Sequence, residues 1–217
     1  MARIKEIDKL RFIDMIFHFD QYGGLSEGLV ELPRPQMIRI DRKNYRVPYL
    51  MDELAENICY GQRLFLTQEE QNDYDLITRI MDGYYYPIVT GKKWDNEKAL
   101  LFGKKVLTCK AKELYPVAMH LINLISELVD REKKLLHREH SKLEKAAGIE
   151  KLNVFADMMS LDFLRDAMKI TTEEVLLTPY KECLVRFMIQ KETNGFQERY
   201  IELMHEQNKP KAKYHAK

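Results

Sequence analysis

This chain of 217 residues contains few cysteines and few glycines, and its net charge is close to zero. The cysteines are odd in number and lack paired spacing, which excludes a disulfide framework and the usual cysteine zinc sites: Cys59, Cys109 and Cys183. We expect reduced, mostly buried thiols in an intracellular protein. Nine glycines and eleven methionines favour helices over a fold rich in tight turns.

The charges nearly cancel, with 35 Lys and Arg against 34 Asp and Glu and a net charge of +1. This balance provides no field that would attract nucleic acid or a membrane surface. No stretch approaches the roughly 20 apolar residues that span a bilayer. Charged residues also interrupt the apolar residues of the first turns, unlike a signal peptide. We therefore expect a soluble protein whose partner is neither nucleic acid nor membrane.

Hydrophobic residues make up 45% of the chain, enough for a substantial core, and most recur at helical spacing. The expected fold is mainly α, a helical domain with a small N-terminal β-hairpin. We divide the chain into an N-terminal helix (1–20), a Gly/Pro linker (21–36), the hairpin with the helical domain (37–207) and a disordered basic tail (208–217). The linker allows the first helix to be a detachable appendage.

The hairpin is predicted from the sequence MIRIDRKNYRVP, Met37–Pro48. Its two halves favour strand, and Asp41, Lys43 and Asn44 lie at the expected turn. Pro48 ends the second strand because it has no backbone N–H for a ladder hydrogen bond. Two strands alone are marginal in water, so this hairpin must pack on helices or be completed by a strand of a partner.

Capping and breaking residues set the expected boundaries of the middle helices. Thr67 and Glu70 form a capping box at the start of one helix, which ends at Pro87. The longest helix begins near Pro116 and, if unbroken to Ala147, would extend about 50 Å. Its charged second half would then project or contact another chain.

The C-terminal part shows a second capping box, formed by Thr171 and Glu174. After Pro179 the apolar residues cover more than one face, so we interpret the next helix as central. The pair Asn194-Gly195 is expected to end it.

A metal site is one interpretation of His137, His140 and Glu144, which share a face of the longest predicted helix. The alternative is a solvated charged face, because these residues lie within the run REKKLLHREHSKLEK. Di-iron bundles use Glu-x-x-His, and Lys134 stands where that Glu would be. The solvated face is the preferred interpretation, and no cofactor is expected.

Three consecutive tyrosines, Tyr84 to Tyr86, with Trp94 nearby, have two interpretations. They could stack on bases, but such platforms carry more positive charge than the pair Lys92-Lys93. They could equally pack in the core or at a protein interface, which suits the amphipathic tyrosine side chain better.

Sequence signals for catalysis are missing. No glycine-rich loop follows a predicted strand, and no carboxylate pair stands out from the surface charge. Cys59 could be a nucleophile, but no recognisable signature places a histidine beside it, and a packed thiol explains it better. We do not expect an enzyme.

Several segments resemble the tail assembly chaperones of tailed phages, particularly those that infect gut Bacteroidetes. The first is MIRIDRKNYRVPYLMDELAENICYGQRLFL, in which a short hairpin leads to a helix and a Gly61-Gln62 step. Similar segments follow at Tyr84–Ile88 and Tyr115-Pro116, and at GIEKLNVFADM and EEVLLTPYKECLVRFMIQKETNGFQERY. The resemblance spans Met37–Leu203 and consists of hydrophobic and turn positions, without a catalytic motif. Residues 1–36 depart from the pattern.

The resemblance implies a non-catalytic assembly factor in the host cytoplasm that binds a long helical tape-measure protein, or a tail-tube component, and can form homo-oligomers. Residues of the hairpin and the aromatic cluster would contact the partner: Ile38, Ile40, Tyr45, Val47, Tyr84, Tyr85 and Trp94. One alternative is a structural neck or tail protein that stays in the virion. Another is a helical metal-binding protein or enzyme that uses His137 and His140.

Overall fold

The computed structural model describes residues 9–17, 28–29, 32–68, 72–138 and 142–207. Over these residues the mainly α prediction is confirmed, and the only sheet is one two-stranded hairpin. The elements are α2 (Phe12–Phe17), β1 (Met37–Ile40), β2 (Lys43–Arg46), α5 (Met51–Asn57), α6 (Tyr60–Leu66), α7 (Asp73–Thr90), α8 (Asn96–Val106), α9 (Ala111–Leu136), α10 (Lys142–Ala146), the 3₁₀ helix η2 (Ile149–Phe155), α11 (Ala156–Met168), α12 (Thr172–Leu177) and α13 (Tyr180–Gln207).

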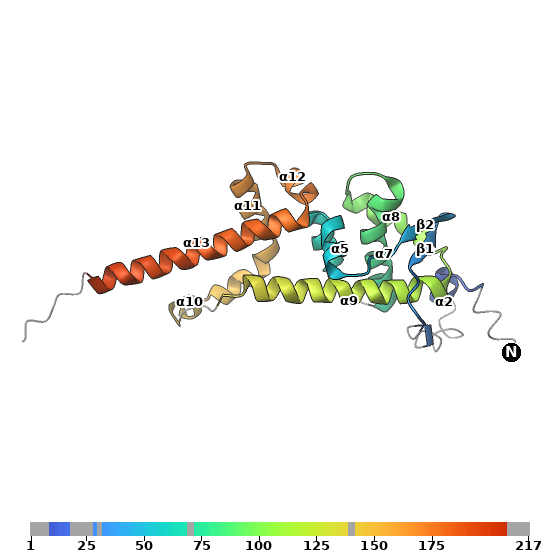
Figure 1. Cartoon of the computed structure of the whole chain (residues 1–217), viewed down its shortest axis with the longest axis horizontal. Helices are drawn as coiled ribbons and strands as arrows, with labels where there is room; N and C mark the ends of the chain where they lie inside the picture. The colour runs from blue at the N-terminus through green and yellow to red at the C-terminus, as the bar shows by residue number, and fades with distance from the viewer. Residues whose placement is uncertain (1–8, 18–27, 30–31, 69–71, 139–141, 208–217) are drawn as a thin grey trace, which may run out of the picture.

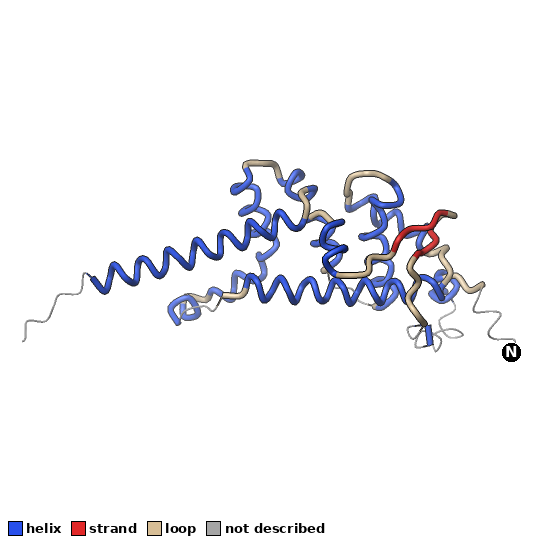
Figure 2. Tube along the Cα trace, in the orientation of Figure 1, coloured by secondary structure: helices blue, strands red, loops and turns tan. Residues whose placement is uncertain are grey.

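Helix α9 is the spine of an elongated molecule (Figure 1). The hairpin, α2, α7 and α8 gather at one end of α9, and the strands are confined to that end (Figure 2). Helix α13 starts beside α5, runs over the other end of α9 and extends beyond it, while α11 and α12 cover its first turns. The molecule therefore has a compact body and a protruding C-terminal helix.

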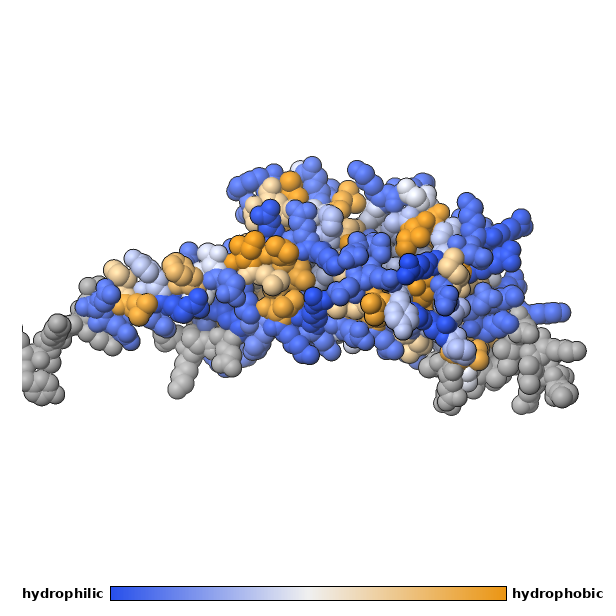
Figure 3. Space-filling model, in the orientation of Figure 1, coloured by the Kyte–Doolittle hydropathy of each residue, from blue (hydrophilic) through white to orange (hydrophobic). Residues whose placement is uncertain are grey.

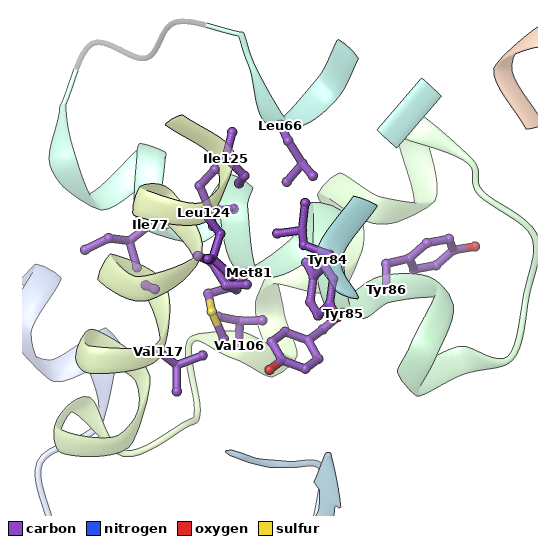
Figure 4. Packing of buried hydrophobic residues seen from close by; sticks show 14 of the residues in the cluster. Leu66, Ile77, Met81, Tyr84, Tyr85, Tyr86, Val106, Val117, Leu124 and Ile125 are labelled. Atoms are coloured by element: carbon purple, nitrogen blue, oxygen red, sulfur yellow. The ribbon is translucent and has the colours of Figure 1, made fainter. Parts of the chain in front are cut away.

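The core of the body lies between α7 and α9, with α6 and α8 closing its sides (Figure 4). Helix α9 is amphipathic, and its buried positions recur every three or four residues from Leu114 through Leu121 to Leu128. Helix α7 contributes a fully buried stretch that includes Met81 and Tyr85. Burial of a large apolar side chain contributes about 1.5–3 kcal/mol, so this seam dominates the stability of the body.

The hairpin prediction is confirmed with a tighter turn than expected. Met37 pairs with Arg46 and Ile40 with Lys43, so only Asp41 and Arg42 form the turn. Both turn residues have positive φ, 50° and 67°, as the two-residue type I′ turn requires. The apolar face of β1 packs on the helices, which is how a two-stranded sheet becomes stable here.

The described part of the N-terminal segment is docked, which corrects the interpretation as a detachable appendage. Phe12 and Met15 are fully buried, and the Phe12 ring contacts those of Tyr74 and Tyr115. The backbone N–H of Phe12 donates to the carbonyl of Cys109 at 3.0 Å. The expected start of this helix and the basic tail lie outside the described residues.

Helix α7 continues through Pro87 to Thr90, where the sequence predicted an end at Pro87. A proline cannot donate to the carbonyl four residues earlier, here that of Gly83. The side-chain amide of Gln62, which is buried, donates to that carbonyl at 2.8 Å instead. Gly91, with φ 66°, then ends the helix in the left-handed conformation.

Two further boundaries differ from the prediction. Thr67 ends α6 instead of starting a helix, and Asn72 caps α7 by accepting a hydrogen bond from the N–H of Asp75. Helix α9 begins at Ala111, one turn before Pro116, and stops at Leu136 because His137 adopts an extended ψ of 130°. The predicted helix to Ala147 is therefore two separate elements, α9 and α10.

Helix α13 runs unbroken through Asn194-Gly195 for 28 residues, where a break was predicted. It is also not central. Only Tyr180 and Cys183 are buried in it, whereas Val185 and Ile189 are 52% and 55% exposed. The apolar residues on several of its faces thus do not all enter the core.

A candidate protein-binding groove

An apolar groove of about 340 Å³ lies where α13 leaves the body, between α5, α9 and α13. Figure 3 shows apolar side chains gathered at this crossing. Helix α5 contributes one wall, the C-terminal half of α9 the second, and the first turns of α13 the third. The apolar lining is Met51, Ala55, Leu128, Leu135, Tyr180, Leu184, Val185 and Met188.

The start of α13 fixes the third wall. The N–H of Tyr60 donates to the carbonyl of Thr178 at 2.9 Å, and the N–H of Tyr180 donates to the carbonyl of Ile58 at 3.1 Å. These two bonds clamp the start of α13 to the junction of α5 and α6. Tyr180 and Cys183 are buried there, while the next turn presents Val185 to the groove.

A partly buried polar cluster lies beside the groove and includes Tyr180 of its lining. Arg63 of α6 and Glu132 of α9 form a bidentate pair at 2.9 and 3.0 Å, with side chains only 15% exposed. The hydroxyl of Tyr180 donates to Glu132 Oε2 at 3.3 Å, and burial raises the pKa of Tyr180 above its usual value. The cluster ties α6, α9 and α13 together, so two of the three walls of the groove, α9 and α13, are joined through it.

The charges at the groove rim are already paired with one another. Arg131 Nη1 lies 2.7 Å from Asp52 Oδ1, and Lys181 Nζ lies 2.7 Å from Glu56 Oε1. These pairs are exposed and contribute little to stability. The apolar lining of the groove thus has charges of both signs at its edge, and this arrangement suits an amphipathic helix better than a small polar ligand.

Further apolar side chains are exposed on the same half of the molecule. Val154 and Phe155 of η2 are 86% and 52% exposed, and Met158 of α11 is 63% exposed. Four side chains of the second half of α13 are also more than half exposed: Phe196, Tyr200, Ile201 and Leu203. Exposed apolar residues that cluster in this way are typical of protein-interaction surfaces.

The residues that the sequence predicted to contact a partner lie in the core instead. Five are buried, with at most 4% of their surface exposed: Ile38, Ile40, Val47, Tyr84 and Tyr85. Tyr45 and Trp94 are partly buried against the same core. The alternation of β1 faces its isoleucines toward the helices, so these side chains cannot reach a partner while the body is folded.

Trp94 illustrates why the aromatic cluster is not a stacking surface. Its ring contacts Phe65 and Tyr86 edge-on, with centroids 5.2 and 6.2 Å away. It also covers Gly61, where an added Cβ would lie 2.8 Å from the indole. The ring therefore joins α6 to α7, and the packing interpretation of the tyrosines accounts for their burial.

The two described metal candidates, His137 and Glu144, lie on separate elements. His137 ends α9, Glu144 of α10 pairs with Arg138 at 2.9 Å, and His140 lies outside the described residues. Across the described ranges, no three His, Cys, Asp or Glu side chains are arranged to hold an ion. The break after α9 removes the shared helical face on which the prediction depended.

The thiols are packed groups. Cys109 and Cys183 are buried, and burial raises the pKa of each to about 12. Burial also raises the pKa of Cys59, whose side chain is partly exposed. At neutral pH all three thiols are protonated and therefore poor nucleophiles.

Sequence patterns missed the groove because its residues belong to three helices far apart in the chain. The one sequence signal is the excess of apolar residues after Pro179, which predicts a central helix but marks a helix that is half exposed. In the described part of the chain, no helix is both long and apolar enough to cross a membrane. Comparisons of the chain with protein-family models, with curated proteins and with solved structures found no match.

Proposed function

We propose that this protein is a non-catalytic assembly factor that binds an amphipathic helix of a protein partner in the groove between α5, α9 and α13. The partner is a long helical protein of the tape-measure type, and the factor acts as a tail assembly chaperone. The observation that carries the proposal is the exposed apolar lining of the groove, in which the side chain of Val185 is 52% exposed and that of Met188 37% exposed.

The shape and chemistry of the groove support a helical ligand. Its walls are three helices, and a fourth helix laid between them would bury the apolar floor as in other helix-in-groove complexes. Two methionines, Met51 and Met188, line it, and their flexible thioethers adapt to different apolar side chains. A partner with repeated apolar positions along a helix could be held at many points by many copies.

The sequence resemblance supports the same proposal. Met37–Leu203, which resembles tail assembly chaperones, contains all three walls of the groove. The resemblance implied contacts through the hairpin side chains. Because these are buried, the contacts proposed here are the groove side chains instead.

Co-expression with a long coiled-coil protein of the tape-measure type tests the proposal. We expect the partner to remain in the supernatant and to co-purify with the full-length chain. Val185→Glu should reduce the co-purified partner at least about tenfold, because a carboxylate would be placed on the apolar floor. Val154→Glu is the matched control, since Val154 is 86% exposed and lies outside the groove.

Two results would contradict this function. The first is no change in the partner's solubility with the wild-type chain, and the second is equal capture by the wild-type chain and Val185→Glu. Mass spectrometry of purified particles separates the virion alternative. A chaperone is absent from the mature particle, whereas a neck or tail protein is present in fixed stoichiometry.

A further inference from the structure

The second half of α13 carries a narrow apolar stripe, defined here as Ile189, Phe196, Tyr200 and Leu203. Their side chains are 53–62% exposed together with that of Ile201, and Ile189, Phe196 and Leu203 are spaced by seven residues. At 100° per residue the four lie within about 60° of one another around the helix. This is the seam of a helix that pairs with one other helix.

The stripe faces away from the body. Lys191 Nζ donates to the carbonyl of Leu135 at 2.8 Å, and Glu198 pairs with Arg138. Both residues lie about 180–210° around the helix from the centre of the stripe. The contacts that hold α13 to the end of α9 therefore lie on the opposite side of the helix and leave the stripe open to solvent.

Helix α13 also has weak intrinsic helix propensity at its middle. The run Thr193-Asn194-Gly195 combines three poor helix formers, and a mid-helix glycine alone costs about 1 kcal/mol relative to alanine. Every residue from Phe196 to Gln207 is exposed. A helix with this sequence and this exposure needs packing partners for most of its stability.

We propose that the stripe pairs with the stripe of a second copy of this chain, with the two α13 helices antiparallel. In that orientation Glu192 of one copy lies beside Arg199 of the other, and the helix dipoles oppose each other. Lys181, Lys191 and Glu198 already contact the body and take no part in the pairing.

The stripe matches itself about a two-fold axis at Phe196. Ile189 and Leu203 are each seven residues from Phe196, so Ile189 of one copy meets Leu203 of the other, and the two Phe196 rings meet at the axis. Glu192 and Arg199 flank the same side of the stripe. The antiparallel copy brings Glu192 within one residue of the level of Arg199 at both ends of the contact.

The size of the contact predicts a weak dimer. Eight side chains with about half of their surface exposed, and aromatic side chains that bury roughly 150–250 Å² each, give an interface of about 1,000 Å². This is at the low end for specific complexes, so we expect dissociation constants in the micromolar range.

Sedimentation velocity of the full-length chain over micromolar concentrations tests the dimer. The wild-type mass should rise from 25.8 kDa toward twice that value. Ile189→Glu should raise the dissociation constant at least about tenfold. Ile201→Glu is the matched control, because Ile201 is 53% exposed, against 55% for Ile189, and lies on another face. It should change the constant less than about twofold.

A charge exchange tests the orientation. Glu192→Arg alone should weaken the dimer, because it places two cations at each end of the contact, and adding Arg199→Glu should restore it. Leu203→Glu repeats the stripe test should Ile189→Glu perturb the helix by circular dichroism. A monomer at all concentrations, equal effects of Ile189→Glu and Ile201→Glu, or no rescue by the double exchange would overturn the proposal. Val185 lies on the same face of α13 as the stripe, so partner capture is measured separately with Met51→Glu, which changes the groove on α5 and leaves α13 unchanged.

Discussion

Gln62 and Gly83 are joined by a hydrogen bond of 2.8 Å in which a side-chain amide replaces the helical donor that Pro87 lacks. The same glutamine accepts a hydrogen bond from the N–H of Cys59 at 3.0 Å. One buried side chain thus caps α6 and completes the ladder of α7, so the junction of the two helices depends on it.

Gln62→Leu should destabilise the protein by about 2–3 kcal/mol, because it leaves two buried backbone groups without partners. Pro87→Ala supplies an N–H for the carbonyl of Gly83. We therefore expect Gln62→Leu to cost less in a Pro87→Ala background. Urea unfolding of the four proteins of this double-mutant cycle measures the coupling. A coupling free energy of zero would mean that Gln62 does not compensate for Pro87.

Glu132→Gln should cost about 2–4 kcal/mol in the free energy of unfolding, because it removes the bidentate partner of Arg63 and leaves only Asp157, whose carboxylate oxygen lies 4.0 Å away. The control is Glu56→Gln, which breaks the Lys181 pair, whose side chains are 45% and 63% exposed. Its expected cost is below about 1 kcal/mol. Thermal or urea unfolding distinguishes the two variants, and equal costs would contradict the structural role of the buried pair.

Asp82 should make stability depend on pH. Burial raises its pKa to about 8 from an ordinary value of 3.8, and its Oδ1 has no hydrogen-bond partner among the described residues. Between about pH 4 and 8 the unfolded chain releases this proton and the folded chain keeps it. The free energy of unfolding therefore falls as pH rises, by up to about 1.4 kcal/mol per pH unit.

The neutral variant Asp82→Asn should remove that component of the slope. Chemical unfolding at several values of pH from 5 to 8, for the wild type and the variant, provides the comparison. Parallel curves for the two proteins would show that Asp82 titrates with an ordinary pKa.

His120 should give the opposite dependence at lower pH. Arg34 Nη1 lies 2.8 Å from His120 Nε2, and the carbonyl of Pro48 lies 2.9 Å from each of these nitrogens, so the tautomer of a neutral imidazole decides whether Nε2 accepts from the guanidinium or donates to the carbonyl. Burial, with the nearby Arg34 charge, lowers the pKa of His120 below 6.5. As pH falls below that value the unfolded chain binds a proton first, so stability decreases.

His120→Gln keeps an acceptor for Arg34 and cannot be protonated. We expect this variant to lose the decrease in stability below pH 6.5, measured in the Asp82→Asn background so that the two titrations do not overlap. An unchanged acid slope would assign it to other groups.

Local signals in the sequence were sufficient for elements whose stability is local. The hairpin follows from alternation and a turn, and the capping box of Thr171 and Glu174 forms as expected, with hydrogen bonds of 3.2 and 2.8 Å. Pro87 and Thr67 were misassigned because tertiary contacts decide there. The donor that lets α7 continue comes from Gln62, 25 positions before Pro87 in the chain.

The groove could not be predicted for a related reason. Apolar spacing indicates that a face is to be covered, but it does not distinguish the core from a partner. Leu121 and Ile189 are both apolar positions of long helices, yet one is fully buried and the other is 55% exposed. The difference in burial arises because α9 runs through the body whereas α13 extends beyond it.

The clamp between residues 58–60 and 178–180 sets an order of events during synthesis. Its two hydrogen bonds join parts of the chain about 120 positions apart, so they form only after residue 180 has left the ribosome. The hairpin and α5 to α9 can collapse earlier around their own core. The α13 wall of the groove therefore forms after the other two walls, and a nascent chain does not offer the completed groove to other proteins until α13 has emerged.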